Sequence, residues 1–178
     1  MEHSYKAYKV SSRTRDLVNS ALLVSLVFIS TRFLNIRLPI SINGGLIHLG
    51  NTMLFMSAIV FGRRKGAIAG AFGMAIFDVL SGWAAWAPFT FLIRGIMGYI
   101  VGSFANAKDR EGNSLIWNIT GITIAGVLML IGYYITEVIL YGNFISPVTS
   151  IPGNVIQLVV GALVGIPASA ALKRTRMV

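Results

Sequence analysis

The sequence predicts an all-α membrane protein, a six-transmembrane-helix bundle whose N-terminus and C-terminus are both cytoplasmic. Three observations support this prediction. The mean hydropathy is +0.74, and only 12% of the residues are charged, about half the charged fraction of a typical soluble domain. The apolar residues gather in runs that are long enough to span a membrane. The basic residues stand in short clusters between those runs.

The length predicts a single transmembrane domain over residues 1–178. We expect a basic cytoplasmic arm at 1–16, the helix bundle at 17–172 and a cytoplasmic tail at 173–178. A spanning helix needs about 20 mostly apolar residues. The predicted spans are 17–34, 46–61, two helices within 66–107, 115–141 and 155–172. The run 66–107 is twice the needed length, and we place its break near Ser81-Gly82 and Ala87-Pro88.

The positions of the basic residues predict the orientation of the bundle. With six spans, most of them fall on one side: Lys6, Lys9, Arg13, Arg15, Arg63, Arg64, Lys65, Lys108, Arg110, Lys173, Arg174 and Arg176. The opposite loops hold only Arg37, with Arg32 near a helix end. Cytoplasmic loops carry an excess of lysine and arginine, so we expect both termini in the cytoplasm. The net charge of +9 therefore indicates topology, and we expect no nucleic-acid partner.

Small residues recur four apart on several predicted spans, for example at Gly66 and Gly70. Such spacing lets helix backbones approach closely in lipid, and on most spans we interpret it as packing inside the bundle. Ala21 and Ser25 on the first span differ, because they lie near the cytoplasmic end beside the basic arm. A surface for a partner protein is one interpretation of this pair, and internal packing is the other.

Polar side chains inside the spans predict a binding site. Ionisable residues in a membrane are costly and usually functional, and Asp78, Arg94 and Glu137 lie inside the predicted spans. The orientation above brings them to the outer half of the bundle. Further candidates reach a similar depth: His48, Trp86, Tyr133, Asn154 and Gln157. A polar and aromatic pocket that opens outward would suit the capture of a small organic solute.

Each candidate also has a purely structural interpretation. Arg94 could pair with Asp78 or Glu137 as an internal ion pair. Trp86 could belong to an interfacial aromatic belt. His48 could be a hydrogen-bonding residue at a helix end. The convergence of several such residues on one depth is the stronger argument for a site.

The sequence offers little support for enzyme chemistry. It contains no cysteine, which excludes disulfides and thiolate metal sites. The segment 62–66 has neither the spacing nor the Ser/Thr of a phosphate-binding loop. No H-E-x-x-H zinc motif or G-x-S-x-G nucleophile elbow is present. We expect no metal, no cofactor and no ATPase activity of the chain itself.

Glycines and polar residues in the first part of the chain carry a family resemblance. Residues 45–50 read Gly-Leu-Ile-His-Leu-Gly. The pattern continues further along the chain with residues 61–66, Asp78 with Gly82, the pair Ala87-Pro88 and residues 95–102. This pattern resembles the substrate-specific subunits (S components) of energy-coupling factor (ECF) vitamin transporters. The resemblance implies a multi-pass protein of the prokaryotic plasma membrane that binds a vitamin or precursor from outside. It also implies docking on a membrane coupling subunit that is driven by two ATPase subunits.

The resemblance assigns roles to particular residues. The family's first helix carries an A-x-x-x-A docking motif, which corresponds here to Ala21 and Ser25, with serine as a small departure. The family's pocket uses the loop between helices one and two, together with helices four to six. That loop is 35–45 here, and it contains Asn43 and two glycines, which gives enough flexibility for a lid.

The resemblance constrains the substrate less closely. Acid, base, amide and aromatic groups together suit a small heteroaromatic that stacks and forms hydrogen bonds. Hydroxymethylpyrimidine or a pyridoxine-like vitamer is the first expectation, and riboflavin or another vitamin is the alternative. A noncatalytic membrane scaffold is an alternative of a different class, and a small membrane enzyme is a third.

Overall fold

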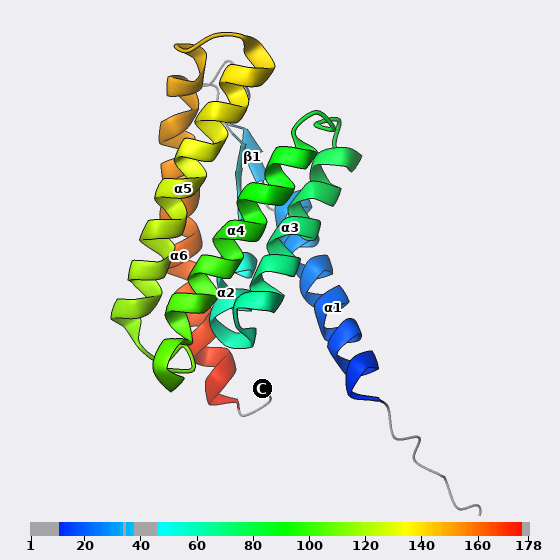
Figure 1. The fold of residues 1–178 in the computed structure, drawn as a ribbon, viewed down its shortest axis with the longest axis vertical. Helices are drawn as coiled ribbons and strands as arrows, with labels where there is room; N and C mark the ends of the chain where they lie inside the picture. Colours follow the sequence, from blue (N-terminus) through cyan, green and yellow to red (C-terminus); the bar gives the residue numbers. More distant parts are fainter. Residues whose placement is uncertain (1–10, 34, 38–45, 176–178) are drawn as a thin grey trace, which may run out of the picture.

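The computed structural model describes residues 11–33, 35–37 and 46–175, and Figure 1 shows their arrangement. Within these residues, six α-helices form one bundle, with a pair of short strands and two 3₁₀ turns between them. In chain order the elements are α1 (Ser12–Phe33), β1 (Asn35–Arg37), β2 (Leu46–His48), α2 (Gly50–Phe61), α3 (Arg63–Leu80), α4 (Ala87–Ala105), η1 (Ala107–Asp109), α5 (Leu115–Tyr141), η2 (Ser146–Ser150) and α6 (Ile151–Arg174).

The all-α prediction is confirmed in outline. Among the residues that the structure describes, four segments are long and apolar enough to cross a membrane: α1, α4, α5 and the continuous η2–α6 segment. Helix α2 has 12 residues, which is about 18 Å and shorter than the hydrocarbon core. Helix α3 carries three basic residues in its first turn and Asp78 near its end. That all six helices span the membrane, with cytoplasmic termini, stays a prediction. The start of α1 and the end of α6 both lie at the lower end of the view in Figure 1, opposite the α3–α4 connection.

The two strands were not predicted. They pair antiparallel, with Asn35 opposite His48 and Arg37 opposite Leu46. The predicted second span began at residue 46, and that boundary is wrong, because 46–48 pair with β1 and the helix starts at Gly50. Segments of three residues are too short to show strand periodicity. The predicted lid residues between the strands, including Asn43, lie outside the described residues.

The predicted break inside 66–107 is confirmed. Helix α3 ends at Leu80, and Gly82 takes a positive φ of 86°, a backbone conformation that glycine adopts without strain. Helix α4 begins at Ala87 with Pro88 in its first turn, where the missing amide hydrogen costs nothing. The last helix begins at Ile151, four residues before the predicted start, because η2 leads directly into it.

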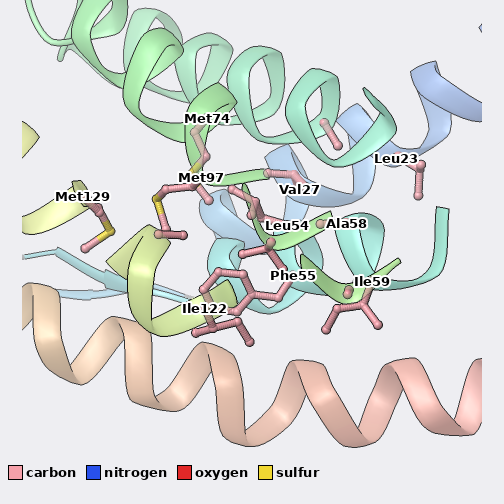
Figure 2. Close-up of a cluster of buried hydrophobic side chains, with 14 of the residues drawn as sticks. Leu23, Val27, Leu54, Phe55, Ala58, Ile59, Met74, Met97, Ile122 and Met129 are labelled. Carbon is pink, nitrogen blue, oxygen red and sulfur yellow. The ribbon is translucent and has the colours of Figure 1, made fainter. Parts of the chain in front are cut away.

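Helix α2 lies at the centre of the bundle and contacts α1, α3, α4 and α6. Its side chains Leu54, Phe55 and Ile59 are fully buried. Figure 2 shows them gathered with Met97 of α4 and Ile122 of α5, among other apolar side chains. The short central helix is therefore stabilised by packing against the neighbouring helices and not by contact with lipid.

The small residues pack inside the bundle as predicted. A Cβ atom at Gly98 of α4 would collide with the carbonyl oxygen of Gly66 of α3, and one at Gly70 would lie 2.7 Å from the carbonyl oxygen of Arg94. A Cβ atom at Gly161 of α6 would lie 2.6 Å from the Cβ of Asn51 of α2. Backbones that approach this closely gain dispersion and weak Cα–H···O contacts.

Single cysteines in this cysteine-free chain test the predicted topology. Arg64, Asn113 and Phe144 are exposed, and none has a positive φ. We expect a membrane-impermeant maleimide to label only Phe144→Cys in sealed cells, and all three variants after the membrane is permeabilised. Labelling of Arg64→Cys or Asn113→Cys in sealed cells would contradict six spans with cytoplasmic termini.

Candidate functional site

Polar side chains from four helices meet around Arg94 of α4. Arg94 is 2% exposed and Asn51 of α2 is fully buried. Gln157 of α6 and Tyr133 of α5 complete the cluster, and both are buried. Arg94 lies seven residues after the start of α4, about 10 Å along the helix axis from the end that faces the α3–α4 connection.

The guanidinium of Arg94 is bound on all three nitrogens. Its Nε donates to the hydroxyl of Tyr133 at 3.0 Å, and one terminal nitrogen donates to the amide oxygen of Gln157 at 2.8 Å. The other terminal nitrogen donates to the amide oxygen of Asn51 and to the sulfur of Met129. Asn51 also donates to Gln157 at 3.2 Å. We call Arg94, Asn51, Tyr133, Gln157 and Met129 the arginine clamp.

The ion pair considered from the sequence is not what surrounds Arg94. Within the described residues, no carboxylate oxygen lies within 4.0 Å of its guanidinium. Its partners are two amides, a phenol and two thioethers, and its Cζ lies 5.1 Å from the centre of the Tyr133 ring. A buried charge must be satisfied by hydrogen bonds or paired, and here neutral groups do this.

Aromatic rings extend from the clamp through Tyr133. The Trp86 ring centre is 6.2 Å from that of Tyr133 and 6.1 Å from that of Tyr141. Trp86 is partly buried and packs against the core, so it faces the interior as well as the bundle edge. The Tyr133 hydroxyl donates to Thr90 at 3.3 Å, which fixes the ring. These rings offer flat apolar faces beside polar groups.

Glu137 stands one helical turn beyond Tyr133 on α5. It is 3% exposed, and its carboxylate accepts a hydrogen bond from Ser150 of η2 at 2.9 Å. Holding a carboxylate at this depth is costly. Glu137 therefore places a strong hydrogen-bond acceptor where α5 contacts η2.

The remaining predicted residues are more scattered. His48 ends β2, is 8% exposed, and accepts a hydrogen bond from the backbone of Gly50 at 3.1 Å on its Nδ1, in keeping with a helix-end role. Asp78 lies on α3, outside the clamp. Its buried Oδ2 has no hydrogen-bond partner among the described residues. Asn154 is partly buried in the first turn of α6, one turn before Gln157.

Sequence reasoning did not assign several residues of this cluster. Asn51 is a polar residue in the first turn of an apolar span, and that signal was available. Met129 and Met97 look like ordinary apolar span residues, and only the structure places their sulfurs 3.1 and 3.6 Å from the Arg94 guanidinium. Thr90 is similarly inconspicuous in the sequence, although its hydroxyl accepts from Tyr133.

The predicted partner surface lies on the outside of the bundle. Ala21 and Ser25 are both exposed on α1, and the Ser25 hydroxyl donates to the Ala21 carbonyl at 2.9 Å. Because that hydroxyl is satisfied within its own helix, the pair presents a small and nearly apolar face. Leu22 and Leu26 flank it and are also exposed.

Comparison with known proteins identifies the family. The sequence profile of the family described as "ECF-type riboflavin transporter, S component" matches residues 11–174, nearly the whole chain. The chain belongs to this S component family. An S component is a transport subunit and not an enzyme, and the long apolar helices agree with a membrane location.

Two individual proteins are similar to this S component over most of its length. A protein of Pyrococcus woesei, described as an uncharacterized protein in a gap 3′ region, is 33% identical over 130 residues, 73% of this chain and 84% of the relative. The thiamine precursor transporter HmpT of Lactococcus lactis subsp. cremoris (strain MG1363) is 25% identical over 161 residues, 90% of this chain and 89% of HmpT.

A solved structure shows that the S component fold is shared. It is described as the structure and mechanism of the S component of a bacterial ECF transporter, and it matches with a TM-score of 0.70 at 20% sequence identity. The match covers 94% of this chain and 100% of the solved chain. The family profile and the shared fold therefore confirm the predicted resemblance to ECF S components, and with it the general role of a transport subunit.

Proposed function

We propose that this S component captures a small planar vitamin precursor of the hydroxymethylpyrimidine or pyridoxine type from outside the cell. The observation that carries the proposal is a group of buried polar and aromatic side chains that are connected to one another. Tyr133 and Gln157 bind the buried Arg94 guanidinium, Trp86 packs against the Tyr133 ring, and Glu137 lies one turn beyond Tyr133 on α5. Ring nitrogens, amino groups and hydroxyl groups on a flat ring would match these donors, acceptors and aromatic faces.

In this proposal the residues take separate roles. Glu137 and Asn154 bind polar groups of the substrate, and Trp86 or Tyr133 stacks on its ring. Arg94 holds Tyr133 and Gln157 in place, since its own donors are already used inside the clamp. His48 of β2 and Asp78 of α3 lie at the edge of the site, and the segment with Asn43 covers it as a lid. The relative HmpT supports the substrate class, because its name specifies a thiamine precursor.

Riboflavin is the second candidate, and the description of the family profile favours it. Titration of the purified chain with hydroxymethylpyrimidine, pyridoxine and riboflavin distinguishes the small-ring candidates from riboflavin. We expect one of the two small rings to bind at least about tenfold more tightly than riboflavin, a difference of about 1.4 kcal/mol. Tighter binding of riboflavin would reverse the assignment. Absence of binding by all three would favour the scaffold alternative.

Transport in this proposal needs partners that supply energy. The S component docks through the α1 face at Ala21 and Ser25 on a membrane coupling subunit, and two ATPase subunits hydrolyse ATP. Small, exposed residues on an outward helix face support this docking, because they let a partner helix approach closely. The chain resides in the plasma membrane of a prokaryote.

A bulky residue tests the docking face. We expect Ala21→Trp to abolish uptake of labelled substrate by cells that contain the partner subunits, because the indole prevents close helix contact. Binding to the isolated subunit should remain at its original affinity, because Ala21 is exposed on α1 and outside the arginine clamp. Ser25→Ala keeps the face small and serves as the matched control, with full uptake expected. Normal uptake by Ala21→Trp would reject this face.

A further inference from the structure

An apolar groove runs along the outer surface where α3 and α4 meet. Its volume is about 290 Å³. Small residues form its floor, and larger exposed side chains form its walls. The floor residues are Ala67, Ala71 and Gly95, and Phe72 and Phe91 are on the walls. The Phe72 and Phe91 rings meet edge to face with centres 5.0 Å apart.

One end of the groove leads to exposed cationic side chains. Arg63 lies one helical turn before Ala67 on α3, and Tyr99 lies one turn after Gly95 on α4. The Arg63 Cζ is 5.5 Å from the centre of the Tyr99 ring, so the guanidinium reaches across from α3 to α4 at that end. Arg64 follows it and is also exposed.

The charges of these two arginines are available to a ligand. Their neighbour Lys65 pairs with Asp16 of α1 at 2.9 Å. For Arg63 and Arg64, by contrast, the part of the chain that the structure describes places no carboxylate within 4.0 Å. The groove is therefore an apolar surface depression with two positive charges, those of Arg63 and Arg64, at one end.

We propose that this groove binds an anionic phospholipid, with one acyl chain along the floor and the phosphate at Arg63 and Arg64. The distance from Arg63 to Phe72 is nine residues, about 13 Å along the helix. This is close to the depth of one hydrocarbon leaflet, roughly 15 Å. Basic side chains at a membrane surface attract anionic headgroups, and the apolar floor suits a hydrocarbon chain. The lipid belongs to the leaflet at which Arg63 lies, and the site is separate from the arginine clamp.

Lipid retention tests the proposal. The full chain is purified in detergent, incubated with phosphatidylglycerol or phosphatidylcholine of identical acyl chains, and analysed by native mass spectrometry. We expect phosphatidylglycerol to be retained about 5- to 25-fold more than phosphatidylcholine, since each arginine contributes about fivefold. The double variant R63Q/R64Q should lose this preference, and R63K/R64K should keep it. R174Q removes a charge at the end of α6 and should change nothing.

A second variant tests the acyl chain. Ala67→Leu places a larger side chain on the floor, and we expect it to lower retention of both lipids while the preference for phosphatidylglycerol remains. Equal retention of the two lipids by the original chain would overturn the proposal. A preference that survives in R63Q/R64Q would also overturn it. So would disulfide-linked dimers of Phe91→Cys in membranes, because a second copy would then occupy the groove.

Discussion

Replacing Arg94 by methionine is expected to destabilise the protein by roughly 3 kcal/mol or more. Hydrogen bonds to a charged group contribute about 1.5–3 kcal/mol each, and this change removes those to Tyr133, Gln157 and Asn51. The methionine keeps much of the side-chain length, so the effect reports lost polar contacts more than lost volume. Thermal unfolding in detergent measures it.

Two further variants make the Arg94 result specific. Arg94→Lys keeps the charge but has one compact ammonium, which cannot reproduce the planar set of donors, and we expect it to recover only part of the stability. Arg32→Met removes an exposed arginine at the end of α1 and should melt like the original chain. If Arg94→Met melted normally but bound substrate poorly, Arg94 would be a substrate contact and the clamp role would be wrong.

Replacing Glu137 by glutamine is expected to weaken substrate binding about 10- to 150-fold. The change removes a charge but keeps an oxygen that can accept the hydrogen bond from Ser150, so the fold should be preserved. A charge-assisted contact is worth roughly 1.5–3 kcal/mol, which gives this range of affinity. Titration calorimetry with the preferred ligand measures the effect, and a melting curve accompanies it.

The control for Glu137 is Glu111→Gln, because Glu111 is exposed in the α4–α5 connection and far along the chain from the site. It should bind as the original chain does. Unchanged affinity in Glu137→Gln with a lower melting temperature would give Glu137 a structural role. In that case the proposed substrate class would lose its main polar contact, while family membership would stand.

Much of the fold could be predicted, because the bilayer imposes simple rules on length and polarity. The rule of about 20 apolar residues predicted α5 with its observed bounds and α4 within about two residues of its end. Helix α1 starts at Ser12, five residues before the predicted span, because the polar residues 12–16 of the predicted arm continue the helix. The break between α3 and α4 was visible in Ser81-Gly82 and Pro88. The pairing of Asn35–Arg37 with Leu46–His48 was not, since it depends on contacts between short segments and not on periodicity.

The candidate site was predicted in part for a similar reason. Arg94, Tyr133 and Gln157 stand out as polar groups in apolar spans, and orientation placed them at one depth. Their mutual hydrogen bonds could not be predicted, because helix rotation about the axis is set by packing. The sequence suggested a carboxylate partner for Arg94, and the structure gives it neutral amides and the sulfur of Met129 instead.

The close approach of α3 and α4 has a consequence for motion. Gly66 faces Gly98, and Arg63 faces Gly102, with main-chain atoms in direct contact. There are no flexible side chains at these points to absorb a shift, so sliding would cause clashes between main chains. Across the α5–α6 contact, by contrast, Gly126 meets the end of the Leu158 side chain, which can change rotamer. We therefore expect α3 and α4 to move as one rigid unit during transport, while the α5–α6 contact can adjust.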